Sequence, residues 1–344
     1  MSNESTPAVQ QSQPSLLRSL FRARESSVVL VLMILCLALY FSPAQKQFFS
    51  QLNWQNLMLQ IALLSIFAIG ETVVIITGGI DLSLGSLIAF SGMLLALTAT
   101  SFNARMYTNM AVLLAVLIAL GASLLIGGLH AALIHRLKLP PFVVTLAALT
   151  FFRSQSLLMN HQLPIPVTDF TILRWLANGK ILEGTPFAIP VPMAILVIVA
   201  IGIHLLLSRS KMGRHIYSVG SNEQATRLSG VNVGRVKFVA YGTSAVLCGL
   251  AGVLYAGYGG QGDPLSGNGY ELNAVAAAVI GGANLSGGQG SVAGTVLGAC
   301  LLRVILSGIN LTIPKASLWE GTVIGGVLLM AVLTSALQQR RSEK

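Results

Sequence analysis

Charged side chains inside apolar stretches are the residues of this chain with the clearest chemical potential. Glu71, Arg153 and Arg303 each lie within an apolar run, although only 9% of the 344 residues are charged. A charge at such a position usually faces the interior of a helix bundle, because burial without a partner is costly. We expect Glu71 and Arg153 to border a path for a polar solute. An ion pair between them that only supports the structure is the open alternative.

A short sequence occurs twice with small changes. GGIDLS at 78–83 returns as GGANLS at 281–286. Paired glycines allow a left-handed backbone, and an Asp or Asn oxygen can cap the next helix. Both copies therefore predict a break between two helices, and such paired breaks in a membrane are typical of a translocation site. The candidate pathway residues are Asp81, Ser83, Asn284 and Ser286, with helix capping alone by Asp81 and Asn284 as the alternative.

The polar loop 208–237 contains a third feature, a short capped helix. Ser221 or Asn222 can cap this helix, and Gly230 can end it in a left-handed conformation. Short helices in such loops can dock onto another protein. A second polar segment, 160–186, is amphipathic in places and could contact the membrane surface or an outside partner, or be a solvated loop.

Enzyme, nucleotide and metal signatures are absent from the sequence. It contains no GxxxxGK[ST], no HExxH, no nucleophile elbow and no carboxylate pair at a catalytic spacing. Cys36, Cys248 and Cys300 lie in apolar runs and are interpreted as packing residues, without a disulfide or zinc site. His130 is expected to be a core or interfacial histidine with satisfied hydrogen bonds. We therefore expect no catalytic residue, cofactor or metal in this chain.

The elements that position these residues must be membrane helices. The chain is 54% hydrophobic with a mean hydropathy of +0.76, and only 9% of its residues are charged, whereas soluble domains carry about 25% charged residues. Continuous apolar runs such as 111–129 exclude a β-barrel, whose strands alternate over about ten residues. The predicted fold is an all-α polytopic membrane protein.

Apolar runs and breakers predict ten spans. They cover 27–42, 57–77, 83–100, 110–134, 142–159, 188–207, 237–258, 271–284, 290–309 and 318–337. Fourteen Lys and Arg residues lie on the side of the termini and five on the other, which predicts that both termini are cytoplasmic. The expected organisation is a tail at 1–25, a transmembrane domain at 26–338 and a tail at 339–344. The net charge of +10 then reflects orientation, and no nucleic-acid partner is expected.

The spans contain no ring or run of charge, which favours a neutral polar solute over an ion. An ion-coupled secondary carrier is the alternative, and it would use Glu71 or Asp81 to hold a proton or a sodium ion.

Four ordered motifs carry a family resemblance. The chain resembles the permease subunits of ribose-type ATP-binding-cassette (ABC) importers in four stretches. These are TGGIDLSLGS at 77–86, PFVVTL at 141–146, the loop from 220 to 232, and GYELNAVA at 269–276, which leads into a Gly-Gly pair. The resemblance spans about residues 55 to 335. Two departures concern His130-Ala131, where relatives commonly have Asn-Gly, and Ser154, where glycine is common.

The resemblance implies a multi-pass subunit of the bacterial inner membrane, in a homodimer or heterodimer. Its implied partners are a periplasmic or lipid-anchored sugar-binding protein and a cytoplasmic ATPase pair that binds ATP and Mg. The implied cargo is a pentose, a hexose or the sugar-like signal autoinducer-2. The positions that match the family's ATPase-coupling helix are Glu223, Ala225, Arg227, Leu228 and Gly230.

Overall fold

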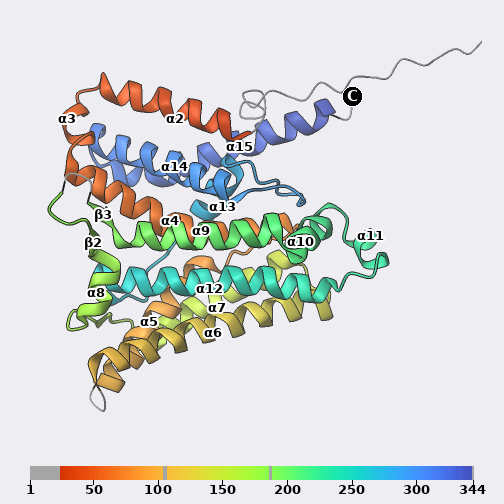
Figure 1. Cartoon of the computed structure of the whole chain (residues 1–344), viewed down its shortest axis with the longest axis horizontal. Coiled ribbons are helices and arrows are strands. Elements are labelled where there is room, and N and C mark those ends of the chain that lie inside the picture. The colour runs from red at the N-terminus through yellow and green to blue at the C-terminus, as the bar shows by residue number, and fades with distance from the viewer. Residues whose placement is uncertain (1–23, 104–106, 186–187, 343–344) are drawn as a thin grey trace, which may run out of the picture.

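The computed structural model describes residues 24–103, 107–185 and 188–342. Within these ranges the chain forms a bundle of helices that run roughly along one common direction (Figure 1). Most of the predicted N-terminal tail and the last two residues of the C-terminal tail lie outside the described residues.

Ten apolar helices build the bundle. They are α2 (Arg24–Tyr40), α4 (Gln51–Ile76), α5 (Leu84–Asn103), α6 (Thr108–Arg136), α7 (Pro141–Leu158), α9 (Val191–Arg209), α12 (Val233–Gly259), α13 (Tyr270–Ile280), α14 (Val292–Thr312) and α15 (Glu320–Ser342). Each predicted span falls on one of them, and the all-α polytopic fold is confirmed. In the described chain seven helices are long and apolar enough to cross a membrane, so the total of ten crossings stays a prediction. The 11 residues of α13 span only about 16 Å, against about 30 Å of hydrocarbon.

Shorter elements close the two ends of the bundle. They are α3 (Gln45–Phe48), β1 (Ile165–Pro166), α8 (Thr171–Asn178), β2 (Lys180–Ile181), β3 (Ile189–Pro190), α10 (Lys211–Ser221), α11 (Glu223–Leu228), β4 (Gln261–Gly262) and the 3₁₀ turn η1 (Ala316–Leu318). The strands form two antiparallel pairs, with Ile165 opposite Gly262 and Lys180 opposite Pro190.

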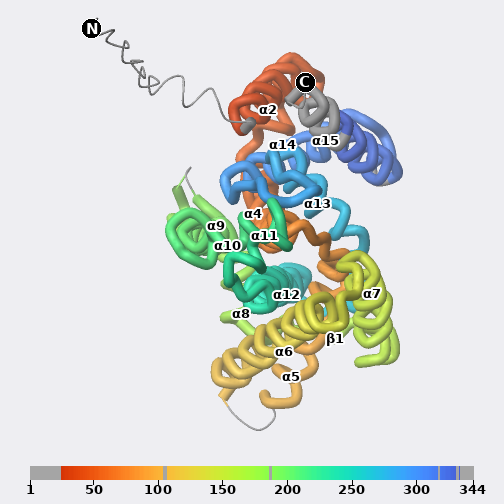
Figure 2. Tube along the Cα trace, turned by 90° about the vertical axis from the view of Figure 1, so that its right-hand side faces the viewer, coloured from red at the N-terminus to blue at the C-terminus, as the bar shows by residue number. Residues whose placement is uncertain are grey.

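The helix α4 lies at the centre of the bundle. Seen from the end that carries α10 and α11, it is surrounded by α9, α12, α13 and α14, and α4 contacts each of these helices (Figure 2). Its most apolar stretch is 94% buried, whereas those of α7 and α9 are 28% and 22% buried. Apolar composition alone does not place α4 there, because α6 and α9 are at least as apolar and are much less buried, so the central position of α4 follows from its contacts with the four helices around it.

The bundle has two distinct ends. The start of α2 and the end of α15 lie at the same end as α10 and α11, while α3, α8, β2 and β3 lie at the other end (Figure 1). This arrangement agrees with an even number of crossings. That the end with α10 and α11 faces the cytoplasm stays a prediction.

Candidate functional site

The first break follows α4, and we call residues 78–83 the buried turn because its polar side chains, Asp81 and Ser83, are fully buried, although Gly78 at its start is exposed. Gly78 has φ +80° and donates its N–H to Ile75 O at 2.9 Å, while Gly79 N–H donates to Val74 O at 3.2 Å. A Cβ on Gly79 would overlap the Tyr241 hydroxyl. The first glycine is therefore required by backbone conformation and the second by close packing.

Two carboxylates organise the buried turn. Asp81 Oδ1 accepts from Ser83 N at 2.9 Å and from Ser83 Oγ at 2.5 Å, and Ser244 Oγ donates to Asp81 Oδ2 at 3.4 Å. Glu71 Oε1 and Oε2 accept from Asp81 N at 3.2 and 3.3 Å. All four side chains are fully buried. Among the described residues neither carboxylate has an ion-pair partner, so N–H and O–H donors alone hold them.

Further polar groups surround this turn. Thr145 Oγ1 of α7 donates to Ile80 O at 3.1 Å, and the rings of His130 and Tyr241 meet edge to face with centroids 6.5 Å apart. In the described part of the chain, Tyr241 Oη and both ring nitrogens of His130 have no hydrogen-bond partner. His130 is a core residue as predicted, and that its hydrogen bonds are satisfied stays a prediction.

The second break contains the same kind of side-chain hydrogen bond and a left-handed glycine, but the left-handed glycine stands one position later. Asn284 Oδ1 accepts from Ser286 N at 3.0 Å, as Asp81 does from Ser83 N. The left-handed residue is now the second glycine of the pair, Gly282, with φ +94°. Asn284 is half-buried and Ser286 is exposed, so this turn is the more open of the two.

The alternative that Asn284 only caps the next helix is wrong. The chain continues through a loop with positive φ at Gly287, Gly288 and Gly290 before α14 begins at Val292. Ser291 caps α14 instead, because Ser291 Oγ accepts from the N–H of Gly294, in the first turn of that helix, at 2.9 Å. In the first copy, by contrast, α5 begins directly after Ser83, and Asp81 holds the turn that enters it.

The helix α10 joins the two breaks. Gly288 N–H, in the loop after the second break, donates to Ile76 O at the end of α4 at 2.9 Å. Gly220 of α10 lies against both groups, with no room for a Cβ beside Ile76 O. Tyr217 Oη, one turn earlier, donates to Gly290 O at 2.8 Å. The helix α10 thus contacts both the end of α4 and the loop before α14.

The helix α11 continues from α10 at the surface. Asn222 Oδ1 caps it by accepting from Ala225 N at 2.9 Å, and Gly230 follows its end with φ +82°. The predicted cap and the predicted left-handed end are both confirmed. Leu228 is 83% exposed and so is open to contact from outside the chain.

One carboxylate connects α11 to α12. Glu223 pairs with Arg227 Nη2 at 2.7 Å and with Lys237 Nζ at 2.8 Å. Partial burial opposes ionisation of Glu223, but the hydrogen bonds and charges of Lys237 and Arg227 outweigh it and hold the pKa of that carboxyl below its usual value. Glu223 is therefore ionised at neutral pH.

Arg153 lies apart from the buried turn. Its Nη1 donates to Pro264 O and to Ser266 O, both at 2.8 Å, in the loop that leads into α13. The alternative of a Glu71–Arg153 ion pair is wrong, because Glu71 accepts from the Asp81 backbone instead. Arg303 is half-buried, and its Nε has no partner among the described residues. The structure brings Glu71, Asp81 and Ser83 together and leaves Arg153 elsewhere.

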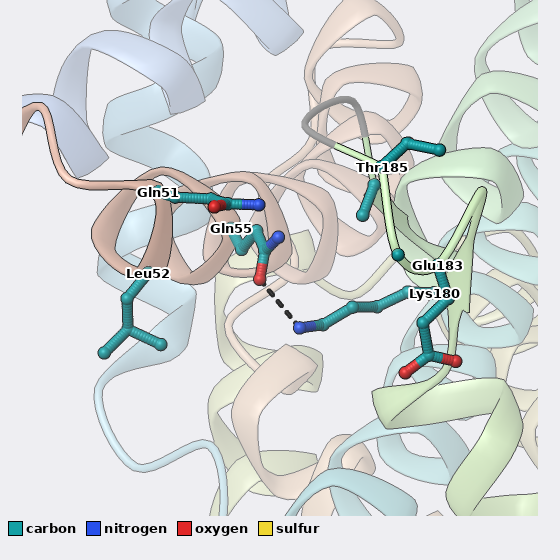
Figure 3. Close-up of a pocket in the computed structure, with 8 residues that line it drawn as sticks. Gln51, Leu52, Gln55, Lys180, Glu183 and Thr185 are labelled. Carbon is teal, nitrogen blue, oxygen red and sulfur yellow. Dashed lines mark hydrogen bonds between the residues drawn. The ribbon is translucent and has the colours of Figure 1, made fainter.

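The opposite end of the bundle carries a pocket of about 470 Å³ (Figure 3). It lies between the start of α4 and the β2–β3 segment, where Lys180 Nζ donates to Gln55 Oε1 at 2.7 Å. The polar segment 160–186 is folded here: Leu173 and Ala177 of α8 are fully buried. Whether this segment contacts the membrane surface or an outside partner, or is only a solvated loop, stays a prediction.

Metal-ligating groups do not gather in the described chain: it has no set of three His, Cys, Asp or Glu side chains placed to hold a metal ion. Cys36, Cys248 and Cys300 are free thiols. The sequence interpretation missed α10. Its signal was present, because Ser210 caps it and the apolar residues Met212, Ile216 and Val219 recur at helical spacing on one face.

Comparison with known proteins gives consistent results. Residues 53–333 match the family described as branched-chain amino acid transport system / permease component. The chain is 34% identical to the ribose import permease protein RbsC of Escherichia coli K12, over 92% of this chain and 94% of that protein. It is also 34% identical to the Bacillus subtilis RbsC, over 86% and 88%, and 33% identical to the probable ABC transporter permease protein YphD of Escherichia coli K12, over 100% and 99%. No solved structure matches the chain.

Proposed function

This chain belongs to the family described as branched-chain amino acid transport system / permease component, and from that premise we propose that it is the membrane-spanning subunit of an ABC importer for a neutral sugar. Similarity to ribose import permeases over more than nine-tenths of the chain supports a sugar as cargo. The low share of charged residues agrees with an uncharged solute. Ribose is the first sugar to test, and other pentoses, hexoses and autoinducer-2 follow.

The contact of α10 with both helix breaks is the observation that carries the proposal. An ATPase that docks on α11 would engage Glu223, Ala225, Arg227, Leu228 and Gly230 and displace α10. Because Gly220 lies against Ile76 O and Gly288 N, the displacement would reach the central helix α4 and α14 together. The helices on either side of the two breaks would then reorient, which exposes the path alternately to each side.

The buried turn serves this mechanism as a rigid joint. Glu71, Asp81 and Ser83 are fully buried and bonded to one another, so in this conformation they hold the backbone between α4 and α5. Asn284 and Ser286 are more accessible and are the stronger candidates for contact with a passing sugar. Arg153 fixes the loop before α13, at the entrance to that helix.

The complex requires partners that supply energy and cargo. The ATPase subunits would bind ATP and Mg, and this chain would contribute no bond chemistry. A sugar-binding protein would deliver the solute at the end with α8, β2 and β3, and a second permease chain would complete the pore. The setting is the inner membrane of a bacterium.

Transport by reconstituted proteoliposomes tests the proposal. The chain is combined with an ABC ATPase and a sugar-binding protein from the same organism, and uptake of labelled ribose is followed with ATP inside the vesicles. Uptake should require ATP and the binding protein and should persist when proton and sodium gradients are collapsed. Uptake without the ATPase that follows an ion gradient would instead identify a secondary carrier.

A further inference from the structure

A second pocket lies between the end of α6 and the start of α12. Its volume is about 550 Å³, within the range of about 300–1,000 Å³ that is usual for small-molecule sites. His135 and Arg136 line it from the last turn of α6, and Arg235 lines it from the first turn of α12. No acidic side chain is among the lining residues.

The basic end of the pocket is electrostatically uncompensated. Arg136 and Arg235 are exposed, and neither has an ion-pair partner in the described part of the chain. At the same place the N-terminus of the 27-residue helix α12 contributes partial positive charge and the C-terminus of α6 partial negative charge, so the net positive charge comes from the arginine side chains. An anionic group with several oxygens, such as a phosphate, satisfies these donors.

The other end of the pocket is apolar. Gly128, Ala131, Ala132 and Phe238 line it. The ring of Phe238 packs so closely on Gly128 that a Cβ there would lie 2.9 Å from Phe238 Cε2. From Gly128 to His135 the pocket follows about 10 Å of α6. A free anion would use only the basic end, whereas a lipid would use both.

The position of the pocket matches a membrane interface. It lies at the end of the bundle that carries α10 and α11, where the predicted cytoplasmic bases are concentrated. The cytoplasmic leaflet is rich in anionic lipids, which basic pockets between membrane helices bind by their head groups. We propose that this pocket holds an anionic phospholipid, with its phosphate between Arg136 and Arg235 and the start of an acyl chain along Ala131 and Ala132.

Lipid retention tests the proposal. The full-length chain is reconstituted in nanodiscs of phosphatidylcholine with a minor share of phosphatidylglycerol, and the bound lipids are identified by native mass spectrometry after release into detergent. The double variant Arg136→Gln/Arg235→Gln should retain phosphatidylglycerol roughly thirtyfold less, since each base near an anionic surface contributes about a fivefold preference. The matched control Arg209→Gln/Arg214→Gln removes two exposed charges at the same end that do not line the pocket, and it should retain clearly more phosphatidylglycerol than the pocket variant.

A steric variant tests the apolar half separately. Ala132→Phe should displace the lipid without a change of charge, and Gly121→Phe, on an open face of the same helix, should not. Equal retention by the double arginine variant and the unaltered chain would overturn the proposal. Full competition by inorganic phosphate would also overturn it and would identify a free-anion site. Unchanged lipid binding together with lost ATPase assembly in the double arginine variant would overturn it as well and would assign the pocket to that partner.

Discussion

The buried turn and the helix α11 each depend on carboxylates, but the two regions hold them in opposite ways. Asp81 and Glu71 are fully buried and accept only from N–H and O–H groups, with no ion-pair partner among the described residues. Glu223 lies at the surface and pairs with Arg227 and Lys237. Loss of an acceptor in the buried turn leaves donors unsatisfied, whereas loss of a surface ion pair changes stability little. We therefore expect stability to depend on the first region and partner recognition on the second.

The largest expected loss of stability follows Asp81→Ala. The substitution leaves Ser83 N, Ser83 Oγ and Ser244 Oγ without this acceptor, so the free energy of unfolding should fall by about 2–3 kcal/mol. Asp81→Asn retains an acceptor oxygen and should lose less. Asn284→Ala, at the half-buried second break, should lose about 1 kcal/mol or less. Thermal unfolding in detergent measures these differences, and equal losses for Asp81→Ala and Asn284→Ala would contradict the distinction.

Substitution of Glu71 should have the next largest effect. Glu71→Ala removes the acceptor of Asp81 N–H and should destabilise the chain by about 1–2 kcal/mol. Glu71→Gln keeps a carbonyl oxygen in place and should recover most of this loss. The same unfolding assay compares the two variants. If the glutamine variant is as unstable as the alanine variant, the negative charge rather than the hydrogen bond is required.

The sequence predicted the position of the buried turn but not its contacts. The Gly-Gly pair before Asp81 identifies the break, because both glycine conformation and Asp capping are local effects. Glu71 reaches the Asp81 backbone across the turn after α4, and Arg153 reaches Pro264 and Ser266, 111 and 113 residues further along the chain, so no local pattern contains that information. For the same reason, the one-residue difference between the left-handed glycines Gly78 and Gly282 was not predictable from their shared sequence.

A smaller effect is expected at the end of α11. Gly230 has φ +82°, and the space that a Cβ would occupy there has no neighbouring atom within 4 Å, so Gly230→Ala meets only backbone strain, about 1 kcal/mol. Gly230→Asn should be milder, since asparagine adopts this conformation more readily. We expect both variants to insert normally and the alanine variant to reduce uptake per ATP hydrolysed. Parallel measurements of sugar uptake and ATP hydrolysis in proteoliposomes check whether the alanine variant couples less well than the asparagine variant. Equal coupling in the two variants would contradict this expectation.

The smallest effect concerns the protonation of Glu223. Its pKa in the folded chain lies below the usual value, so its ion pairs stabilise α11 above the unfolded pKa, and this stabilisation is lost as pH falls through the folded pKa. That window lies below about pH 4.3, and the change should be under about 1 kcal/mol because the pair is partly exposed. Hydrogen exchange of α11 amides at graded pH measures it. Glu223→Gln should remove the pH dependence, and its persistence there would exclude Glu223 as the source.

The surface region was more predictable than the buried one. Asn222 and Gly230 mark the start and end of α11 through local hydrogen bonding and backbone conformation, and both assignments are confirmed. The helix α10 was missed because the basic residues of the loop dominated its interpretation. The contact of Gly220 with Ile76 and Gly288 is tertiary and could come only from the structure.

The central claim is that α10 links α11 to both breaks. Sugar uptake per ATP hydrolysed by a Gly220→Ala complex tests this claim most directly. The methyl group has no room beside Ile76 O, whereas Gly202→Ala, on α9 with open space around it, is the matched control. We predict that the Gly220→Ala complex assembles and hydrolyses ATP but transports far less sugar for each ATP, while the control couples normally. An unchanged ratio in a folded Gly220→Ala complex would contradict the account.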